Sequence, residues 1–389
     1  MVSIPAVRVN RKAADRVRSG HPWIFSSDVI DRRSSQAGDV VRVVDPAGKN
    51  LGVGHYSSAS QITVRLLSSR IEDINEQFLA KRIAAALAYR QRVVTDSDAY
   101  RLVHAEGDLL PGLIVDRYAG WLVVQLLDQG MDRMSAAVAT ALSTVIDVHG
   151  IVARNDLAIR AKEDLPQETT ILSGSIPDRV SIRMNGITMQ ANLLTGQKTG
   201  VFLDQRENYL VARRYARGRA LDCFTATGGF ALHMASACES VEAVDSSAAA
   251  LAEAETNIAA NNLTNIALQK ADVLHYLPGL IAAHRAFDIV VIDPPAFTKS
   301  RSALEGAARG YKEINLRALK LLRSGGILVS CSCSHHMTEA HLLEIVASAA
   351  LDCGKQLRVL DRRTQSQDHP ILLTVPETHY LKCLIFEVI

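Results

Sequence analysis

The feature that most constrains this chain is a regular alternation of strand and helix patterns through its last two hundred residues. The predicted strands span 219–224, 241–245, 266–269, 287–293 and 327–331, and the predicted helices span 228–238, 247–262, 314–322 and 338–350. We expect the helix 314–322 to end at Ser324-Gly325-Gly326. Such alternation is typical of a doubly wound parallel sheet, whose ligands lie beyond the carboxyl ends of its strands. We therefore predict a Rossmann-like α/β domain over residues 186–389.

Two smaller segments precede this domain. Residues 1–70 are rich in valine and turn residues, and short strands at 40–45, 51–56 and 61–67 predict a small β-barrel. Residues 71–185 begin with a connecting helix near 74–94 and continue as a compact α+β domain. Its expected elements are strands at 100–105, 112–116, 121–127, 151–154 and 181–184 and a helix near 131–148. The sequence thus predicts three domains, 1–70, 71–185 and 186–389.

Charge is distributed unevenly between these domains. The net charge is +6 over residues 1–70, −4 over residues 71–185 and zero over residues 186–389. A basic module at one end of a neutral chain suggests a polyanionic partner such as RNA or DNA, although a solvated basic face explains the charge equally well. If phosphates dominate binding, we expect RNA affinity to fall steeply with salt.

Several classes of protein are excluded by simpler features. No apolar run approaches the roughly 18 residues that a membrane span needs, so we expect no membrane partner. Charged residues follow the N-terminus too soon for a secretory signal, and we expect a cytoplasmic protein with its six cysteines reduced. Cys331 and Cys333 have the spacing of a zinc half-site, but no second pair completes it, so we predict no metal.

Three acidic residues at successive strand ends favour an adenosine cofactor. Asp222 precedes a turn in which Gly228 and Gly229 open a helix, without the pattern of a dinucleotide or phosphate loop. Asp245 ends the next strand and could accept both ribose hydroxyls, and Asp272 follows the third strand and could accept from an adenine amine. Each aspartate alone is more simply a helix cap, but together they favour the cofactor.

Two further motifs follow later strands of the sheet. Asp293-Pro294-Pro295 could press a carboxylate and backbone carbonyls against a planar base, although a stiff loop is the simpler reading. Cys331 and Cys333 end a later strand, where a thiol can lie beside the reactive end of the cofactor. Both cysteines could instead be ordinary small core residues.

These motifs resemble those of the RlmI-type large-subunit ribosomal RNA cytosine-carbon-5 methyltransferases. The last two hundred residues resemble class I methyltransferases that use S-adenosylmethionine. The matching motifs are Arg18 to Phe25, Glu106 to Asp116, Gly196 to Arg206, Thr227 to Phe230, Asp293-Pro294-Pro295, Arg309 to Asn315 and Ser332-Cys333-Ser334. The resemblance covers the whole chain, and several long motifs occur in the expected order.

The resemblance implies a PUA domain, a middle α+β domain and a catalytic domain, with ribosomal RNA as partner and S-adenosylmethionine as cofactor. It leaves a homodimer open. It implies RNA contacts at Arg8, Arg11, Lys12, Arg18, His21 and Trp23. The implied cofactor contacts are Asp222, Phe224, Thr227, Gly228, Gly229, Asp245, Asp272, Asp293 and Pro294, with Lys198, Phe202, Gln205 and Arg206 closing over the cofactor.

The resemblance also implies the chemistry. Cys333 is the expected nucleophile, which adds to carbon 6 of cytosine so that carbon 5 can take the methyl group. Asp293 is expected to hold the base, and Cys331 is a weaker candidate nucleophile because it precedes the matching motif. Many related enzymes carry a second cysteine after Asp-Pro-Pro where this chain has Ala296, so the base that removes the carbon-5 proton stays unnamed. The turn also departs from the expected pattern at Thr225 and Ala226, although backbone donors there could suffice.

Three other functions remain open from the residues. A uridine-carbon-5 methyltransferase also needs a cysteine nucleophile, but it usually brings a different cysteine motif. A methyltransferase of base amino groups needs an aromatic residue directly after acid-Pro-Pro and leaves Cys333 without a role. A non-catalytic RNA-binding or ribosome-assembly protein would need only the basic module, and it gives no reason for the retention of Asp245, Asp293 and Cys333.

Overall fold

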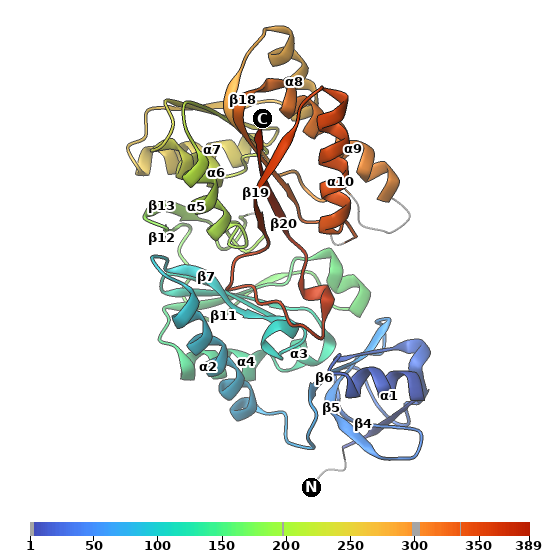
Figure 1. Ribbon diagram of the computed structural model, residues 1–389. Helices are drawn as coiled ribbons and strands as arrows, with labels where there is room; N and C mark the ends of the chain where they lie inside the picture. The colour runs from blue at the N-terminus through green and yellow to red at the C-terminus, as the bar shows by residue number, and fades with distance from the viewer. Residues whose placement is uncertain (1–3, 197, 298–303, 335) are drawn as a thin grey trace. The chain divides into compact units, whose positions relative to one another are not determined.

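The computed structural model describes residues 4–196, 198–297, 304–334 and 336–389, and it divides into two compact units (Figure 1). Unit 1 contains Met1–Ile182, Ala191–Val201 and Gln367–Thr378. Unit 2 contains Arg183–Gln190, Phe202–Ser366 and His379–Ile389. The chain therefore passes repeatedly from one unit to the other. The three domain boundaries predicted from the sequence, 1–70, 71–185 and 186–389, differ from this division into two units and stay a prediction.

The first part of unit 1 is a curled six-stranded sheet with the order β2-β6-β5-β4-β1-β3. Its elements are β1 (Ala6–Val9), α1 (Arg11–Arg18), β2 (Trp23–Phe25), β3 (Val29–Asp31), β4 (Val40–Val44), β5 (Asn50–Tyr56) and β6 (Ile62–Ser68). Valines that alternate along β1 and β4 fill a core that includes Val7, Val9, Val41 and Val43. The small β-barrel expected here is present as this curled sheet, and its three predicted strands are confirmed as β4, β5 and β6.

The second part of unit 1 is a five-stranded sheet with the order β11-β10-β9-β8-β7. Its elements are α2 (Glu76–Val93), β7 (Ala99–His104), β8 (Leu113–Tyr118), β9 (Trp121–Leu126), α3 (Gln129–Arg133), α4 (Ser135–Val145), β10 (Gly150–Arg154) and β11 (Thr169–Gly174). The helix expected near 131–148 is wrong in detail, because the chain forms two helices that meet at Met134. The strand expected at 181–184 is β12 (Val180–Met184), which pairs with β13 (Ile187–Ala191) in a separate sheet.

Unit 2 is built on a seven-stranded sheet with the order β16-β15-β14-β17-β18-β20-β19. The strands are β14 (Arg219–Cys223), β15 (Ser240–Asp245), β16 (Ile266–Lys270), β17 (Phe287–Ile292), β18 (Leu322–Ser332), β19 (Leu357–Arg363) and β20 (Lys382–Val388). The strands from β16 to β18 pair in parallel, and β20 runs antiparallel to both β18 and β19. The predicted Rossmann-like sheet is confirmed.

Six helices in the described part of the chain accompany this sheet. They are α5 (Arg206–Tyr215), α6 (Gly229–Ala235), α7 (Ala248–Ala260), α8 (Val273–Ala282), α9 (Leu304–Leu321) and α10 (Glu339–Asp352). Of these, α6, α7, α9 and α10 overlap the four predicted helices, whereas α5 and α8 were not predicted and α9 begins earlier than expected. Ser247, Asp272 and Thr338 cap α7, α8 and α10 with their side-chain oxygens. The helix α9 ends at Leu321, one residue before the predicted end, but the expected cap at Ser324-Gly325-Gly326 is wrong, because these residues belong to β18, whose pairing with β17 is irregular there.

Candidate functional site

The turn between β14 and α6 has an unusual backbone. Phe224, Ala226 and Gly228 all have positive φ, at 63°, 49° and 92°. The left-handed region costs energy for residues with a side chain, and such strain is concentrated at functional sites. The Thr225 amide donates to the Val244 carbonyl at 3.0 Å, which ties the turn to the end of β15. The turn therefore presents backbone groups at the carboxyl edge of the sheet.

The Asp222 side chain is buried beneath this turn. Its Oδ2 accepts hydrogen bonds from the Thr225 hydroxyl at 2.6 Å and from the Ala231 amide at 3.0 Å. Its Oδ1 is buried and has no hydrogen-bond partner among the described residues. Burial raises the pKa of Asp222 to about 7, and the negative charges of Asp293 and Asp245 raise it further. The two hydrogen bonds lower this pKa, but their effect is smaller than that of burial. The free oxygen suits a ligand that brings a hydrogen-bond donor.

The two other strand-end aspartates differ in exposure. Asp245 is half-buried, and its carboxylate accepts from the Ala226 amide at 3.0 Å and the Ser247 amide at 2.9 Å. Asp272 is exposed and caps α8 by accepting from the His275 amide at 3.1 Å. Asp245 therefore belongs to the turn, whereas Asp272 performs the capping role that its position alone suggests.

Close packing explains the second glycine of the turn. A Cβ built on Gly229 would lie 2.5 Å from the Tyr209 ring, which packs edge-on against Phe230 and stacks on His233. The buried Asn257 side chain donates to the Thr227 carbonyl at 3.0 Å and fixes the turn from the other side. Sequence reasoning missed Tyr209 and Asn257, because nothing in their local pattern distinguishes them from other helical core residues.

The segment that begins at Phe202 reaches the same edge through Gln205. The Gln205 side-chain amide donates to Asp293 Oδ2 at 3.0 Å, and its oxygen accepts from Asn208 at 2.6 Å. Arg206 is buried and pairs with Glu207 at 3.2 Å. Gln205 and Asp293 are therefore brought together, whereas Lys198 is exposed in unit 1. Gln197, from the same motif, lies outside the described residues.

The two cysteines of the later motif have different surroundings. Cys331 is fully buried within β18 and lies opposite Cys383 of β20. Burial raises the pKa of the Cys331 thiol well above its usual value, as does the neighbouring Cys383. Cys333 follows the end of β18 and is half-buried. Cys333 is thus the better placed of the two to meet a substrate.

Tyr311 of α9 holds the residues on both sides of Cys333. The Ser332 hydroxyl donates to the Tyr311 hydroxyl at 2.9 Å, and the Tyr311 and Ser334 hydroxyls are 3.1 Å apart. Tyr311 is fully buried and packs against Phe297, with ring centroids 4.7 Å apart. Its motif supplied part of the family resemblance, and the structure gives a physical reason for the tyrosine.

The predicted RNA contacts in unit 1 fall into two groups. Arg11 and Lys12 are exposed at the start of α1, and Arg8 is half-buried in β1. Arg18 pairs with Asp45 at 2.5 Å. The His21 and Trp23 side chains lie against other protein groups, with His21 3.2 Å from Glu377 and Trp23 donating to Glu106 at 2.8 Å. Arg11, Lys12 and Arg18 are exposed to solvent, whereas Arg8, His21 and Trp23 are half-buried.

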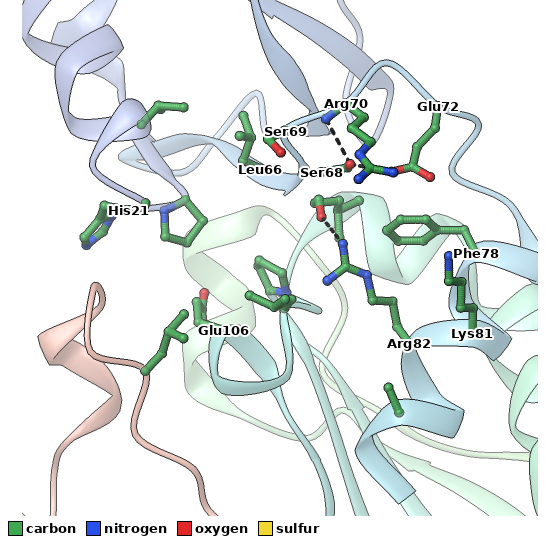
Figure 2. A pocket seen from close by; sticks show the side chains of 18 residues that line it. His21, Leu66, Ser68, Ser69, Arg70, Glu72, Phe78, Lys81, Arg82 and Glu106 are labelled. Atoms are coloured by element: carbon green, nitrogen blue, oxygen red, sulfur yellow. Dashed lines mark hydrogen bonds between the residues drawn. The ribbon is translucent and has the colours of Figure 1, made fainter. Parts of the chain in front are cut away.

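Unit 1 also contains a cavity of about 590 Å³. Figure 2 shows its lining, in which His21 and Glu106 lie on one side and Arg70, Lys81 and Arg82 on the other. Arg82 donates to the Leu67 carbonyl at 3.2 Å, and burial lowers the pKa of its guanidinium. The lining thus combines the basic Arg70, Lys81 and Arg82 with the acidic Glu72 and Glu106.

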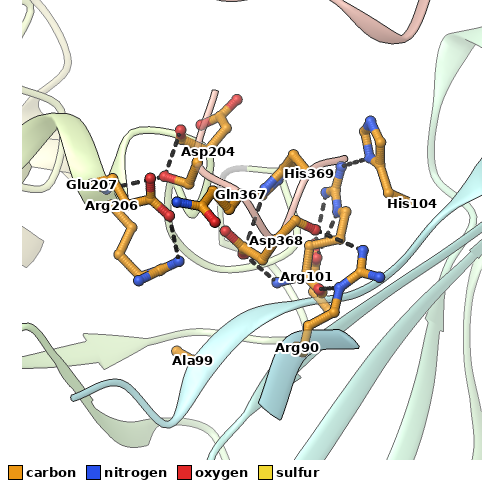
Figure 3. A network of polar contacts seen from close by, with 12 residues as sticks. Arg90, Ala99, Arg101, His104, Asp204, Arg206, Glu207, Gln367, Asp368 and His369 are labelled. Atoms are coloured by element: carbon orange, nitrogen blue, oxygen red, sulfur yellow. Dashed lines mark hydrogen bonds and ion pairs between the residues drawn. The ribbon is translucent and has the colours of Figure 1, made fainter. Parts of the chain in front are cut away.

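A buried polar network holds distant segments of unit 1 together (Figure 3). Arg90 of α2 forms an ion pair with Asp108 and donates to the Asp368 carbonyl at 2.7 Å. The Asp368 carboxylate accepts from the Arg101 amide at 2.8 Å. In the same unit, the Thr199 hydroxyl donates to Asp116 at 2.7 Å. The network fixes both the 191–201 and the 367–378 segments by buried, charged hydrogen bonds.

The described residues contain neither a cluster of metal ligands nor a membrane-spanning helix. No group of three or more histidine, cysteine or carboxylate side chains there could hold a metal ion. No helix in the described part of the chain is long and apolar enough to cross a membrane.

Two protein families match this chain, one over its N-terminal part and one over most of the remainder. The PUA-like domain family matches residues 7–69, and the S-adenosylmethionine-dependent methyltransferase family matches residues 100–386. Two relatives are each named ribosomal RNA large subunit methyltransferase I. The one from Tolumonas auensis is 41% identical over 95% of this chain and 96% of its own length. The one from Shewanella denitrificans is 39% identical over 98% of this chain and 100% of its own length.

A solved structure extends the comparison to the fold. It is described as a methyltransferase complexed with SAH, and it aligns with a TM-score of 0.86 at 21% identity. The alignment covers 99% of this chain and 100% of that chain, and it shows a common fold.

Proposed function

The chain belongs to the S-adenosylmethionine-dependent ribosomal RNA large subunit methyltransferase I family, and we propose that it methylates carbon 5 of a cytosine in large-subunit ribosomal RNA. The observation that carries this proposal is the placement of Cys333 and Asp293. They follow the adjacent parallel strands β18 and β17 at the same edge of the sheet. A half-buried thiol beside a carboxylate suits covalent activation of a base.

The residues at this edge fit the cofactor. The unpartnered Asp222 Oδ1 suits a donor on the ligand, and Asp245 keeps lone pairs for the ribose hydroxyls beyond its two amide partners. When bound, S-adenosylmethionine supplies an activated methyl group. The further proposed contacts in unit 2 are Phe224, Thr227, Gly228, Gly229, Asp272, Asp293, Pro294, Phe202, Gln205 and Arg206. A contact from Lys198 rests on the family resemblance alone.

The proposed role of Cys333 follows from the poor nucleophilicity of carbon 5. Addition of the Cys333 thiolate to carbon 6 forms a sulfur–carbon bond and moves electron density to carbon 5, which then takes the methyl group. A base removes the proton from carbon 5, and the sulfur–carbon bond breaks to return the thiolate. Cys331 suits this role poorly, because its buried thiol has a raised pKa.

The proposed role of Asp293 is to hold the cytosine at its exocyclic amine and ring nitrogen 3. Its carboxylate already accepts from the Gln205 amide, whose own oxygen is fixed by Asn208. A carboxylate oriented in this way contributes positioning as well as charge. Phe297, which packs on Tyr311, lies after the same Asp-Pro-Pro turn.

The PUA-like part of unit 1 is the proposed site of RNA binding. Exposed Arg11 and Lys12 offer cations for phosphate contacts. The cavity in Figure 2 extends beyond the PUA-like domain to Lys81 and Arg82 of α2, and it offers further cations together with the acidic Glu72 and Glu106. Both would position the RNA without reading its sequence.

The test is methyl transfer from labelled S-adenosylmethionine to ribosomal RNA from cells that lack this protein. We expect labelled 5-methylcytidine with the wild type and none with Cys333→Ala. Cys353→Ala is the matched control, because this other half-buried thiol lies at the end of α10. RNA that carries 5-fluorocytosine should trap Cys333 covalently, because fluorine at carbon 5 cannot leave as a proton.

Other outcomes would favour other functions. Label in 5-methyluridine, or in a base methylated on its amino group, would replace the cytosine proposal. Full activity of Cys333→Ala would remove the covalent mechanism. A protein that binds RNA and S-adenosylmethionine but transfers no methyl group to naked or subunit-bound RNA would be a non-catalytic binding protein.

A further inference from the structure

Lys382 is a buried lysine that the mechanism above does not use. It begins β20, and only 3% of it is exposed. It is the only lysine among the fully buried polar residues of the described chain. Lysine is rarely buried, because an ammonium loses its hydration, so a buried one needs compensating partners. No local sequence motif distinguishes it.

The partners of Lys382 place its ammonium next to the proposed nucleophile. Its Nζ donates to the Ser334 carbonyl at 2.7 Å and to the Tyr380 carbonyl at 2.8 Å. Its backbone lies opposite Ser332 in the pairing of β18 with β20. Lys382 therefore contacts the chain on both sides of Cys333. An ammonium has three donors, and these two carbonyls take two of them.

The charges around this pair act in opposite directions. Burial lowers the pKa of Lys382 to about 8, and the neighbouring Cys333 opposes that change. Tyr311 from α9 lies within electrostatic range of both Cys333 and Asp293, and its own pKa is raised by burial. Among these groups Lys382 is the cation. Asp293, Tyr311 and Cys333 each carry a negative charge when they are ionised. A thiolate beside a lysine is stabilised, and its pKa falls.

We propose that Lys382 is a positioning residue whose ammonium holds Cys333 as a thiolate. The inference rests on the proposed function, because it assigns Cys333 as the nucleophile. The thiol proton leaves to solvent before attack, and Lys382 keeps its own proton throughout. When the sulfur–carbon bond breaks at the end of the reaction, the electron pair returns to sulfur beside the same ammonium. Lys382 thus favours both the attacking and the leaving form of Cys333.

A purely structural role makes a different prediction. Lys382 could serve only to join the Ser334 and Tyr380 carbonyls, in which case the ionisation of Cys333 would not depend on its charge. Lys382→Gln keeps a donor for the carbonyls and removes the charge, whereas Lys382→Met removes both. A structural role would show in the stability of Lys382→Met and leave the thiol titration of Lys382→Gln unchanged.

The experiment measures alkylation of the full-length protein by iodoacetamide from pH 5 to pH 10. Mass spectrometry of the peptide that contains Cys333 gives its rate, and Cys353 in the same digest is the internal control. In the wild type we expect a midpoint below the roughly 8.5 of an ordinary cysteine. In Lys382→Gln and Lys382→Met we expect it to rise by about one pH unit or more, which slows alkylation at pH 7 about tenfold. The acid limb of the methyl-transfer profile should move by the same amount.

Two results would overturn the inference. One is a midpoint for Cys333 alkylation in the wild type that lies at or above that of an ordinary cysteine. This measurement does not depend on the folding of any variant. The other is an unchanged midpoint in Lys382→Gln with a native circular dichroism spectrum. Failure of the proposed function is distinguishable, because it appears as methyl transfer by Cys333→Ala, while alkylation reports the Lys382–Cys333 pair without any transfer.

Discussion

Replacing Asp222 by asparagine should remove a specific dependence of stability on pH. The folded-state pKa of about 7 lies above the 3.8 of an ordinary aspartate, because the carboxyl is buried. The folded protein therefore keeps this proton where the unfolded chain has lost it. The stabilising contribution is complete below pH 3.8 and is lost as the pH rises through about 7.

The size of this effect follows from the two pKa values. Each pKa unit corresponds to about 1.4 kcal/mol, so ionisation of Asp222 lowers the free energy of unfolding by about 1.5 kcal/mol at pH 5 and about 4 kcal/mol at pH 8. Asparagine cannot ionise, and its own packing cost does not vary with pH. Relative to the wild type, Asp222→Asn should therefore gain about 2 to 3 kcal/mol between pH 5 and pH 8.

Hydrogen exchange of the β14 amides, measured by mass spectrometry without cofactor, suits this test. Both tryptophans lie in unit 1, so their fluorescence does not report on unit 2. Rates must be corrected for intrinsic exchange at each pH to give opening free energies. His233, whose pKa is lowered to about 4 by burial, titrates equally in both proteins and cancels from the difference. Parallel pH curves for Asp222→Asn and the wild type would refute the reasoning.

Three further perturbations test other parts of the structure. Gly229→Ala should lower the free energy of unfolding by about 1–3 kcal/mol, because the new Cβ would collide with Tyr209. Gly279→Ala in α8 should raise it by about 0.5–1 kcal/mol, because the new Cβ would meet open space. The two variants should therefore shift the melting temperature in opposite directions. Tyr311→Phe should lower the free energy of unfolding by about 1–3 kcal/mol and slow methyl transfer, because it removes the hydroxyl shared by the buried Ser332 and Ser334; unchanged stability and activity would show that these hydrogen bonds do not position Cys333. RNA affinity should fall steeply with salt, and Arg11→Gln should reduce the log–log slope by about one; a flat response in filter binding would exclude phosphate-led binding.

The sequence predicted the parts of unit 2 that follow local rules. The strand β17 (Phe287–Ile292) was predictable because Ile289, Val290, Val291 and Ile292 form a continuous apolar run, as a strand buried on both faces requires. The antiparallel pair β19 and β20 was not predicted, because nothing in Leu357–Arg363 distinguishes an edge strand from a loop. The irregular start of β18 was missed for the opposite reason, since Ser324-Gly325-Gly326 carries a strong local signal for a helix end.

The candidate site shows the same limit. Asp222 and Asp245 could be singled out, because they end strands whose carboxyl edges meet. Gln205 was reached only through the family resemblance, and its contact with Asp293 joins residues 88 positions apart. Lys382 could not be found, because its importance lies in a carbonyl 48 positions away. Contacts of this kind depend on tertiary packing, which periodicity does not encode.

The distribution of unit 1 over three stretches of chain has a consequence for synthesis. Arg90 is buried early in the sequence, but one of its acceptors is the carbonyl of Asp368, which leaves the ribosome almost three hundred residues later. Until that stretch emerges, the nascent unit must leave the Arg90 guanidinium partly unsatisfied or keep it hydrated. Completion of the N-terminal unit is thus tied to completion of the whole chain, and a gene truncated before Gln367 would encode a unit 1 that lacks part of its own interior.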